Sequence, residues 1–226
     1  MTTRRGLVLG AGGVLGAAWT IGALHALTEV EGIDPRECEV IIGTSAGSVL
    51  AALLGTGTSV ADLLAHQRGV PLPALEVEWD YAEATGGAVP ARPRWGVGSP
   101  SLLRQSVRRP RGLPPLAVLA ALTPEGTGTL AEVARLVRAA SGEQGWLDRT
   151  GVWIVAIDYD LGHRVAFGRP GAPQARLDEA VTASCAIPGW YAPVSIDGRR
   201  YVDGGTISTT SADLLAGEGL DEVHVL

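Results

Sequence analysis

The chain has 226 residues, of which 46% are hydrophobic, and a formal net charge of −6 at pH 7. This length and composition predict one folded domain over residues 1–226 with a substantial core, and they exclude a disordered chain. Because there is no basic excess to neutralise phosphates, we expect no nucleic-acid partner.

The two cysteines, Cys38 and Cys185, are too few for a disulfide framework. No Cys/His cluster has the spacing of metal ligands, so we expect no metal and no other cofactor. So few cysteines are typical of a reducing compartment, and we therefore expect a cytoplasmic protein.

The N-terminal residues alternate between strand, loop and helix signals. Residues 5–10 predict a buried strand, residues 11–16 a glycine-rich loop, and residues 17–30 a helix with apolar side chains at helical spacing. Alternatively, Arg4 and Arg5 precede an uncharged stretch, residues 7–24, that imitates an export signal or a membrane span. The four glycines between residues 10 and 16 disfavour both, because they weaken a spanning helix and are typical of a loop.

The strand and turn predicted at residues 39–47 contain the pattern Gly43-x-Ser45-x-Gly47, and a helix follows to about Leu54. This pattern is typical of a sharp strand-to-helix turn that lifts a serine clear of the backbone. At the start of a helix the serine faces free N–H groups, which favour a developing alkoxide. The strand–helix–strand–helix order predicts parallel strands covered by helices, an α/β fold.

Residues 58–150 differ in character from the rest of the chain. Nine of the 14 prolines lie between Pro71 and Pro124, so we expect a long, partly helical insertion, with a mobile helix at about 130–140. The insertion is either a lid or acyl-chain channel, or an irregular segment packed on the surface. Its arginines form either a solvated face or a contact for anionic lipid headgroups; they are Arg104, Arg108, Arg109 and Arg111.

Regular structure is predicted again from residue 152. A β-type run at 152–157 forms a hairpin with 164–167, and a short helix at 177–184 precedes a second hairpin at 193–202. The sequence Asp203-Gly204-Gly205 follows, then a helix near 211–216 and a strand at 222–226. Because the chain ends on a strand of the buried type, we expect it to be a piece of a longer protein.

Acyl transfer needs a nucleophile, a base and hydrogen-bond donors for the oxyanion. The loop at residues 11–16 suits the donors, because successive glycines let backbone N–H groups converge and the next helix adds its dipole. Dinucleotide binding is the rival interpretation of this loop. Against it, Gly16 comes one residue too late for G-x-G-x-x-G, and no acidic residue follows the second strand.

Two kinds of base could serve Ser45. None of the four histidines carries a motif, and only Ser45, Asp203 and His224 have the chain order of an α/β-hydrolase triad. His224, however, lies within a predicted strand, whereas a triad histidine normally lies on a loop. Asp203 is the more attractive base, since it ends a strand and two glycines leave room around its carboxylate; the alternative is a plain turn aspartate.

Three blocks, in this order, resemble the patatin-like phospholipases: residues 12–16, residues 43–47 and residues 203–205. A fourth block, residues 183–188, is similar to the small-residue stretch that precedes the aspartate of that family. The resemblance implies a three-layer α/β/α fold with a central, mostly parallel sheet and a variable, lid-like insertion at 58–150.

The same resemblance implies a Ser–Asp dyad and assigns the site residues. Ser45 would be the nucleophile, Asp203 the base, and the amides around Gly12, Gly13 and Val14 the oxyanion hole. The implied function is hydrolysis of lipid acyl esters, with a lipid ester as partner, peripheral contact with membranes and no cofactor. A patatin-fold protein without turnover, acting as a lipid-binding or regulatory module, is the alternative.

The sequence departs from the family pattern at two positions. Ala11 replaces the usual first glycine, a place that alanine can fill if its φ is negative. Leu15 stands where the family usually has lysine or arginine. This change puts substrate preference in doubt more than the chemistry, which relies on backbone donors.

Overall fold

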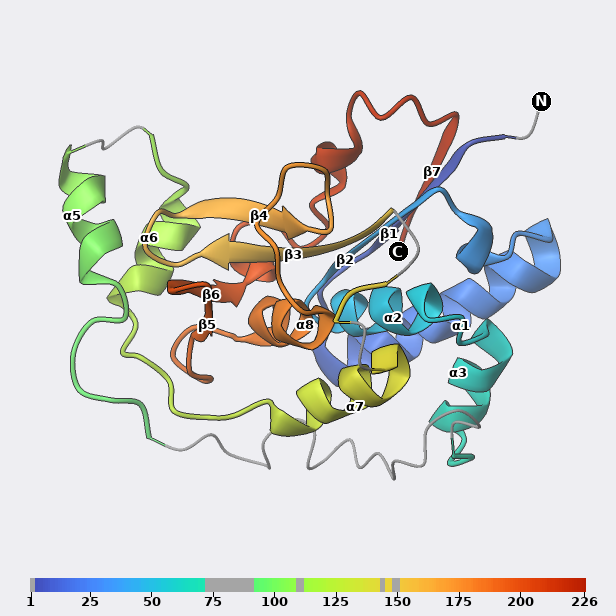
Figure 1. Cartoon of the computed structure of the whole chain (residues 1–226), viewed down its shortest axis with the longest axis horizontal. Coiled ribbons are helices and arrows are strands. Elements are labelled where there is room, and N and C mark those ends of the chain that lie inside the picture. The colour runs from blue at the N-terminus through green and yellow to red at the C-terminus, as the bar shows by residue number, and fades with distance from the viewer. Residues whose placement is uncertain (1–2, 72–91, 109–111, 143–144, 148–150) are drawn as a thin grey trace.

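The computed structural model describes residues 3–71, 92–108, 112–142, 145–147 and 151–226 (Figure 1). Its centre is a seven-stranded sheet in the order β5-β6-β3-β2-β1-β7, with β4 paired to β3 outside this path. The sheet is mixed and mostly parallel, and helices flank it, which confirms the predicted fold class. The strands are β1 (Arg5–Leu9), β2 (Val40–Thr44), β3 (Val152–Asp158), β4 (His163–Phe167), β5 (Val194–Ile196), β6 (Arg199–Asp203) and β7 (Glu222–Val225).

Helices connect the parallel strands β1, β2 and β3. The α-helices are α1 (Gly13–Glu31), α2 (Ala46–Gly55), α3 (Val60–Gln67), α5 (Pro100–Arg108), α6 (Pro115–Leu122), α7 (Ala131–Ser141) and α8 (Leu177–Cys185). Shorter 3-10 helices are η1 (Pro35–Glu37), η3 (Gly204–Thr206) and η4 (Ala212–Leu215).

The stretch at residues 7–24 that imitates a membrane span is divided between β1, a loop and the first turns of α1. The helix ends because Gly32 adopts the left-handed conformation, φ 66°, and caps it with its N–H. Within the ranges that the structure describes, no helix is both long enough and apolar enough to cross a bilayer.

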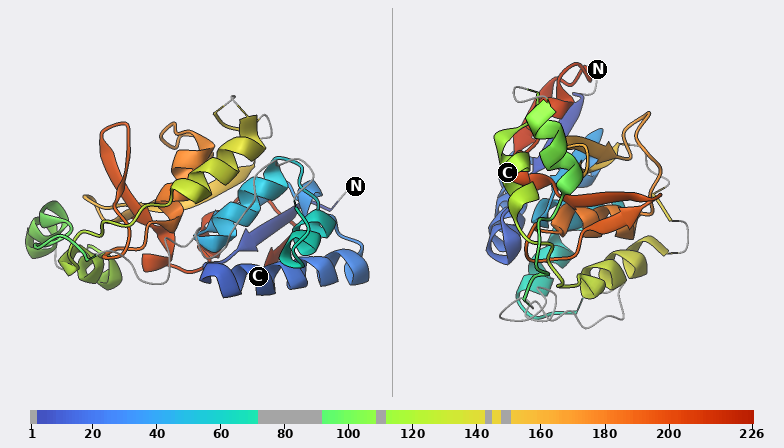
Figure 2. Two further views of the ribbon diagram at one scale, coloured as in Figure 1. Left: turned by 90° about the horizontal axis from the view of Figure 1, so that it is seen from below. Right: turned by 90° about the vertical axis from the view of Figure 1, so that its left-hand side faces the viewer.

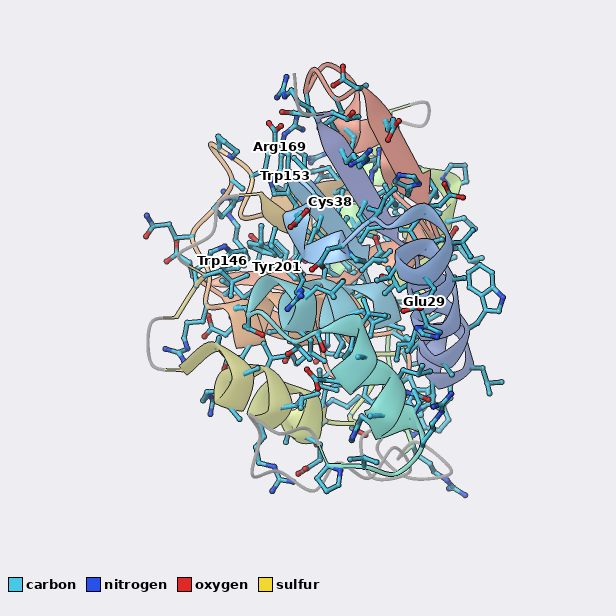
Figure 3. All side chains as sticks on the ribbon, turned by 90° about the vertical axis from the view of Figure 1, so that its right-hand side faces the viewer. Glu29, Cys38, Trp146, Trp153, Arg169 and Tyr201 are labelled. Carbon is cyan, nitrogen blue, oxygen red and sulfur yellow. The ribbon has the colours of Figure 1, made fainter. Side chains whose placement is uncertain are left out.

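Side chains alternate between the two faces of the sheet. Leu7, Leu9 and Ile41 belong to the main core, which packs against α1, α2, α3, α7 and α8, below the strands in Figure 1. Val8 and Ile42 face the other way, towards η4 and the segment around it. On that second face the Arg169 guanidinium lies 4.9 Å from the centre of the Trp153 ring, and Figure 3 labels both residues.

Parts of the expected insertion at residues 58–150 pack into the main core, although its composition predicts an irregular segment. Leu63 of α3 and Leu136 and Val137 of α7 are buried in the main core. The helix expected at about 130–140 exists as α7, and its buried face packs against α8 and α2. By contrast, α5 and α6 form a small cluster of their own at one end of the molecule (Figure 2). Residues 72–91, Arg109 and Arg111 lie outside the described residues.

β3 carries two strands along one edge, and this brings two distant chain segments together. β2 pairs in parallel with its first half, where Thr44 lies opposite Val155. β6 pairs antiparallel with its second half, where Asp203 lies opposite Ala156. Since β4 occupies the other edge of β3, β2 and β6 must run towards each other along the same edge and meet. The strand register therefore places Asp203 beside the turn that follows Thr44.

Candidate active site

The turn after β2 has the geometry of a nucleophile elbow. Ser45 forms its tip with φ 53° and ψ −122°, a positive φ that residues other than glycine rarely adopt. It occupies the N-cap position of α2, and 8% of its surface is exposed. This strained conformation is what the Gly43-x-Ser45-x-Gly47 pattern predicts.

Gly43 and Gly47 are required by close packing. A Cβ on Gly43 would lie 2.7 Å from the Cα of Ser48, and a Cβ on Gly47 would overlap the carbonyl group of Leu9. The Gly47 N–H also donates to the Gly10 carbonyl at 3.2 Å. Gly47 thus brings the start of α2 against the loop that follows β1.

Two buried serines hold the backbone of the elbow. Ser184 Oγ accepts the Ser45 N–H at 2.9 Å and donates to the Val155 carbonyl at 2.6 Å. Ser48 Oγ donates to the Ser45 carbonyl at 2.6 Å. The Ser45 N–H is therefore committed to Ser184, and donors for an oxyanion must come from elsewhere. Ser184 lies in the block at residues 183–188, and the only feature of the sequence that marks it is a hydroxyl among small apolar residues.

Ser184→Ala is expected to lower the free energy of unfolding by about 2–4 kcal/mol, because two buried backbone groups each lose their partner. A matched control is Ser211→Ala. The Ser211 hydroxyl is also buried but has no partner among the described residues, so its removal should cost less than about 1 kcal/mol. Urea denaturation of both variants measures the difference. Equal losses would contradict the proposed role of Ser184.

Asp203 lies at the end of β6 with 4% of its surface exposed. Its carboxylate accepts a hydrogen bond from the Gly205 N–H at 2.7 Å, and the neighbouring Ser45 side chain stabilises its charged form. Its own N–H donates to the Ala186 carbonyl at 2.9 Å, which ties it to the end of α8. Burial raises the pKa of Asp203 from 3.8 to about 6, and the Ser45 side chain and the Gly205 N–H oppose that rise. A carboxylate with this pKa is a better proton acceptor near neutral pH than an ordinary aspartate.

The loop between β1 and α1 presents N–H groups at the start of a 19-residue helix. Such groups have no intrahelical partner, and no side chain caps this helix. Gly13 takes a positive φ of 60°, and Gly12, Gly13 and Val14 are all exposed. The positive end of the helix dipole adds to their attraction for an anion.

Direct contacts join this loop to the turn that holds Asp203. A Cβ on Gly205 would lie 3.1 Å from the Ala11 Cβ and 3.0 Å from Asp203 Oδ1. Ala11 is not among the residues with positive φ, so alanine fills the position without strain, as the sequence analysis required. Leu15 is 86% exposed. The three blocks found in the sequence thus meet at the carboxyl ends of β1 and β2.

The competing residues are placed elsewhere or are chemically unsuited. His224 lies on β7 opposite Leu7, and its Nε2 is 4.0 Å from Glu222. No hydrogen bond or ion pair between described residues joins His224 to Asp203. Cys185 is near the site, but burial and then the charge of Asp203 raise the pKa of its thiol to about 12, so it stays protonated. In the described part of the chain, no group of three or more His, Cys, Asp or Glu side chains could hold a metal ion.

Fold and site together define a class of protein: an α/β protein with a serine on a strained strand-to-helix turn beside a buried aspartate. Serine hydrolases use arrangements of this kind. The family model described as "Patatin-like phospholipase" matches residues 7–216. The chain therefore belongs to the patatin-like phospholipase family, whose members are typically lipid acyl hydrolases, and the resemblance seen in the sequence is confirmed.

Two solved structures are similar to this chain. VipD from Legionella pneumophila matches with a TM-score of 0.56 at 18% sequence identity, covering 99% of this chain and 49% of VipD. The type III effector protein ExoU matches with a TM-score of 0.39 at 22% identity, covering 83% of this chain and 41% of ExoU. The VipD match supports the fold alone, and the chain spans about half the length of either protein. Among curated proteins, no significant match was found.

Proposed function

We propose that the chain is a serine hydrolase that cleaves acyl ester bonds of lipids through an acyl-enzyme on Ser45. The observation that carries the proposal is that the strained turn presents Ser45 beside Asp203, a buried carboxylate whose pKa burial raises to about 6. Family membership supports lipid esters as the class of substrate.

In the first step, Ser45 Oγ attacks the ester carbonyl carbon while Asp203 accepts the hydroxyl proton. The carbonyl oxygen becomes an oxyanion, which the N–H groups of Gly12, Gly13 and Val14 stabilise. The C–O bond then breaks, the alcohol leaves with the proton from Asp203, and the acyl group stays on Ser45.

In the second step, Asp203 takes a proton from a water molecule as its oxygen attacks the acyl-enzyme carbonyl. The fatty acid leaves, and the proton returns to Ser45. No step of this mechanism requires a metal or another cofactor.

A fluorophosphonate probe tests the nucleophile directly. We expect the wild-type protein to be labelled at the peptide that contains Ser45, and Ser45→Ala to lose the label completely. Release of fatty acid from phospholipid vesicles by the wild type, and not by Ser45→Ala, then tests the substrate class. If folded wild-type protein neither takes the label nor releases fatty acid, the catalytically weak lipid-binding module is the better interpretation.

We also propose that the protein works from the cytoplasm and contacts membranes peripherally. Lipid esters with long acyl chains reside in bilayers, so an enzyme acting on them must reach a membrane surface. The sequence has two cysteines, Cys38 and Cys185, too few for a disulfide framework, which suits a reducing compartment.

A further inference from the structure

The helix α6 is apolar on its exposed face. Residues 115–122 contain no polar side chain. Small side chains pack inward and large ones face outward: Ala117, Ala120 and Ala121 are buried, whereas Leu116, Leu119 and Leu122 are 55%, 59% and 52% exposed. A helix on the surface of a globular protein normally turns its large apolar residues inward and polar residues outward. Three exposed leucines on one stripe mark a surface that has an apolar partner.

The helix α5 and the segment at residues 92–97, which lie at the same end of the molecule as α6 (Figures 1 and 2), contain exposed basic and aromatic residues. α5 packs on α6 through Leu102, and its Arg104 and Arg108 are exposed. The segment 92–97 adds the fully exposed Trp95, flanked by Arg92 and Arg94.

These arginines carry uncompensated charge within the described structure. None of the four forms an ion pair with another described residue. The chain as a whole has a net charge of −6, so this end departs from the character of the rest. Cations beside exposed leucines and a tryptophan match the headgroup region of an anionic bilayer, where phosphates lie above acyl chains.

The helix α6 lies next to the segments that hold the candidate active site. α6 contacts η3, which begins directly after Asp203. At the end of α6, Thr123 faces Gly189, where an added Cβ would lie 3.5 Å from the Thr123 Cβ. Gly189 belongs to the loop after α8, which includes the exposed Trp190 and whose Ala186 carbonyl accepts the Asp203 N–H.

We propose that this end of the molecule docks on the surface of an anionic phospholipid bilayer. The docking face is defined by Trp95, Arg104, Arg108, Leu116, Leu119 and Leu122. Its leucines and Trp95 enter the interfacial region, and its arginines meet lipid phosphates. A second copy of the chain fits less well, because a twofold contact would bring the arginines of two protomers together. The purpose of docking rests on the proposed lipid hydrolysis, since it brings ester groups to the part of the molecule that holds Ser45.

Vesicle flotation in the Ser45→Ala background tests docking without any turnover. The probes are vesicles of phosphatidylcholine with and without phosphatidylglycerol. We expect binding to the mixed vesicles, and a loss of about tenfold or more in Leu116→Gln/Leu119→Gln/Leu122→Gln, which places three amides in the interface. Arg104→Gln/Arg108→Gln should lose about tenfold on the mixed vesicles, and raising the salt to about 1 M should have a similar effect on the unmodified docking face.

Matched controls lie at the other end of the molecule. Val30→Gln changes a 77% exposed apolar residue in the last turn of α1, and Arg68→Gln changes an exposed arginine just after α3 (Figure 2). Both should bind vesicles like the parent protein. Circular dichroism melting checks that each variant is folded. If the triple variant is not folded, Leu119→Gln and the double arginine variant carry the test.

Three results would overturn the proposal: no binding by the parent protein, unchanged binding by the folded docking-face variants, or equal losses in the two controls. A dimer seen by light scattering that the triple leucine variant makes monomeric would assign the face to a second copy instead. Activity is separate: with Ser45 intact, the triple variant should keep its activity on a soluble short-chain ester. Lack of any esterase activity in the wild type would count against the proposed function and not against docking.

Discussion

Asp203→Asn is expected to lower kcat for ester hydrolysis by about 10²–10⁴-fold, because an amide cannot accept the proton of Ser45. The substitution preserves shape, and the Asn side-chain oxygen can still accept the Gly205 N–H that Asp203 Oδ1 accepts at 2.7 Å. Fluorophosphonate labelling of Ser45 should slow in parallel. Steady-state kinetics on a soluble ester measures the effect.

The same substitution should stabilise the fold at neutral pH. A variant that is more stable but less active would show that the loss of activity does not come from unfolding. The pKa of Asp203 is raised to about 6 in the folded protein, above its ordinary value of 3.8. Between these values the native state binds more protons than the unfolded state, so stability falls as pH rises through this window and stays lower above it. Asp203→Asn should therefore gain on the order of 2–3 kcal/mol over the wild type at pH 7 and little at pH 4.

The pH dependence of the rate provides a third readout on the same residue. Because Asp203 must be ionised to act as a base, wild-type kcat/KM should fall as pH drops below about 6. Any residual activity of Asp203→Asn should lack this acid limb. His224→Ala is the control and should keep most of the wild-type activity. If His224→Ala were inactive and Asp203→Asn active, the assignment of the base would be wrong.

The elbow could be predicted from the sequence because its constraints are local. A β-branched run that ends in Gly43, followed by Ser45 and Gly47, requires a sharp turn whatever surrounds it. The loop at residues 11–16 is similar, since clustered glycines and a following helix already indicate exposed N–H groups. The meeting of Ser45 and Asp203 is different. It depends on β6 pairing with the half of β3 that β2 leaves free, and no local pattern encodes strand pairing over that separation.

The role of the insertion could not be predicted for a related reason. Proline content marks residues 58–150 as irregular, but whether a helix there is core or surface depends on its partner. α7 is core because Leu136 and Val137 meet the main helical layer. α6 looks like a core helix from its composition, yet it exposes three leucines because α5 covers only its alanine side. Which face of α6 is buried can be decided only when the neighbours of each face are known.

Gly47→Ala is expected to destabilise the fold by about 3 kcal/mol or more, although it adds a single methyl group. The new Cβ would overlap the Leu9 carbonyl and lie 2.7 Å from the Gly10 oxygen. Backbone atoms at the end of a central strand cannot move aside without disturbing the pairing of β1 with β2, where Leu9 lies opposite Gly43. Any folded fraction should also lose labelling at Ser45, because the methyl pushes the elbow away from the loop that holds Gly12 and Gly13.

Gly22→Ala is the matched control for this substitution. Gly22 lies in the interior of α1, exposed, with nothing within 4 Å of an added Cβ. Alanine there should stabilise the protein by about 0.5–1 kcal/mol through helix propensity alone. Both variants add one methyl group, so the difference in their urea midpoints isolates the close approach of α2 to β1. A contradicting result would be a Gly47→Ala variant that stays within about 1 kcal/mol of the wild type and is still labelled at Ser45. The elbow would then not be held against the loop at residues 11–16. The N–H groups of Gly12, Gly13 and Val14 would lie too far from Ser45 to stabilise an oxyanion there.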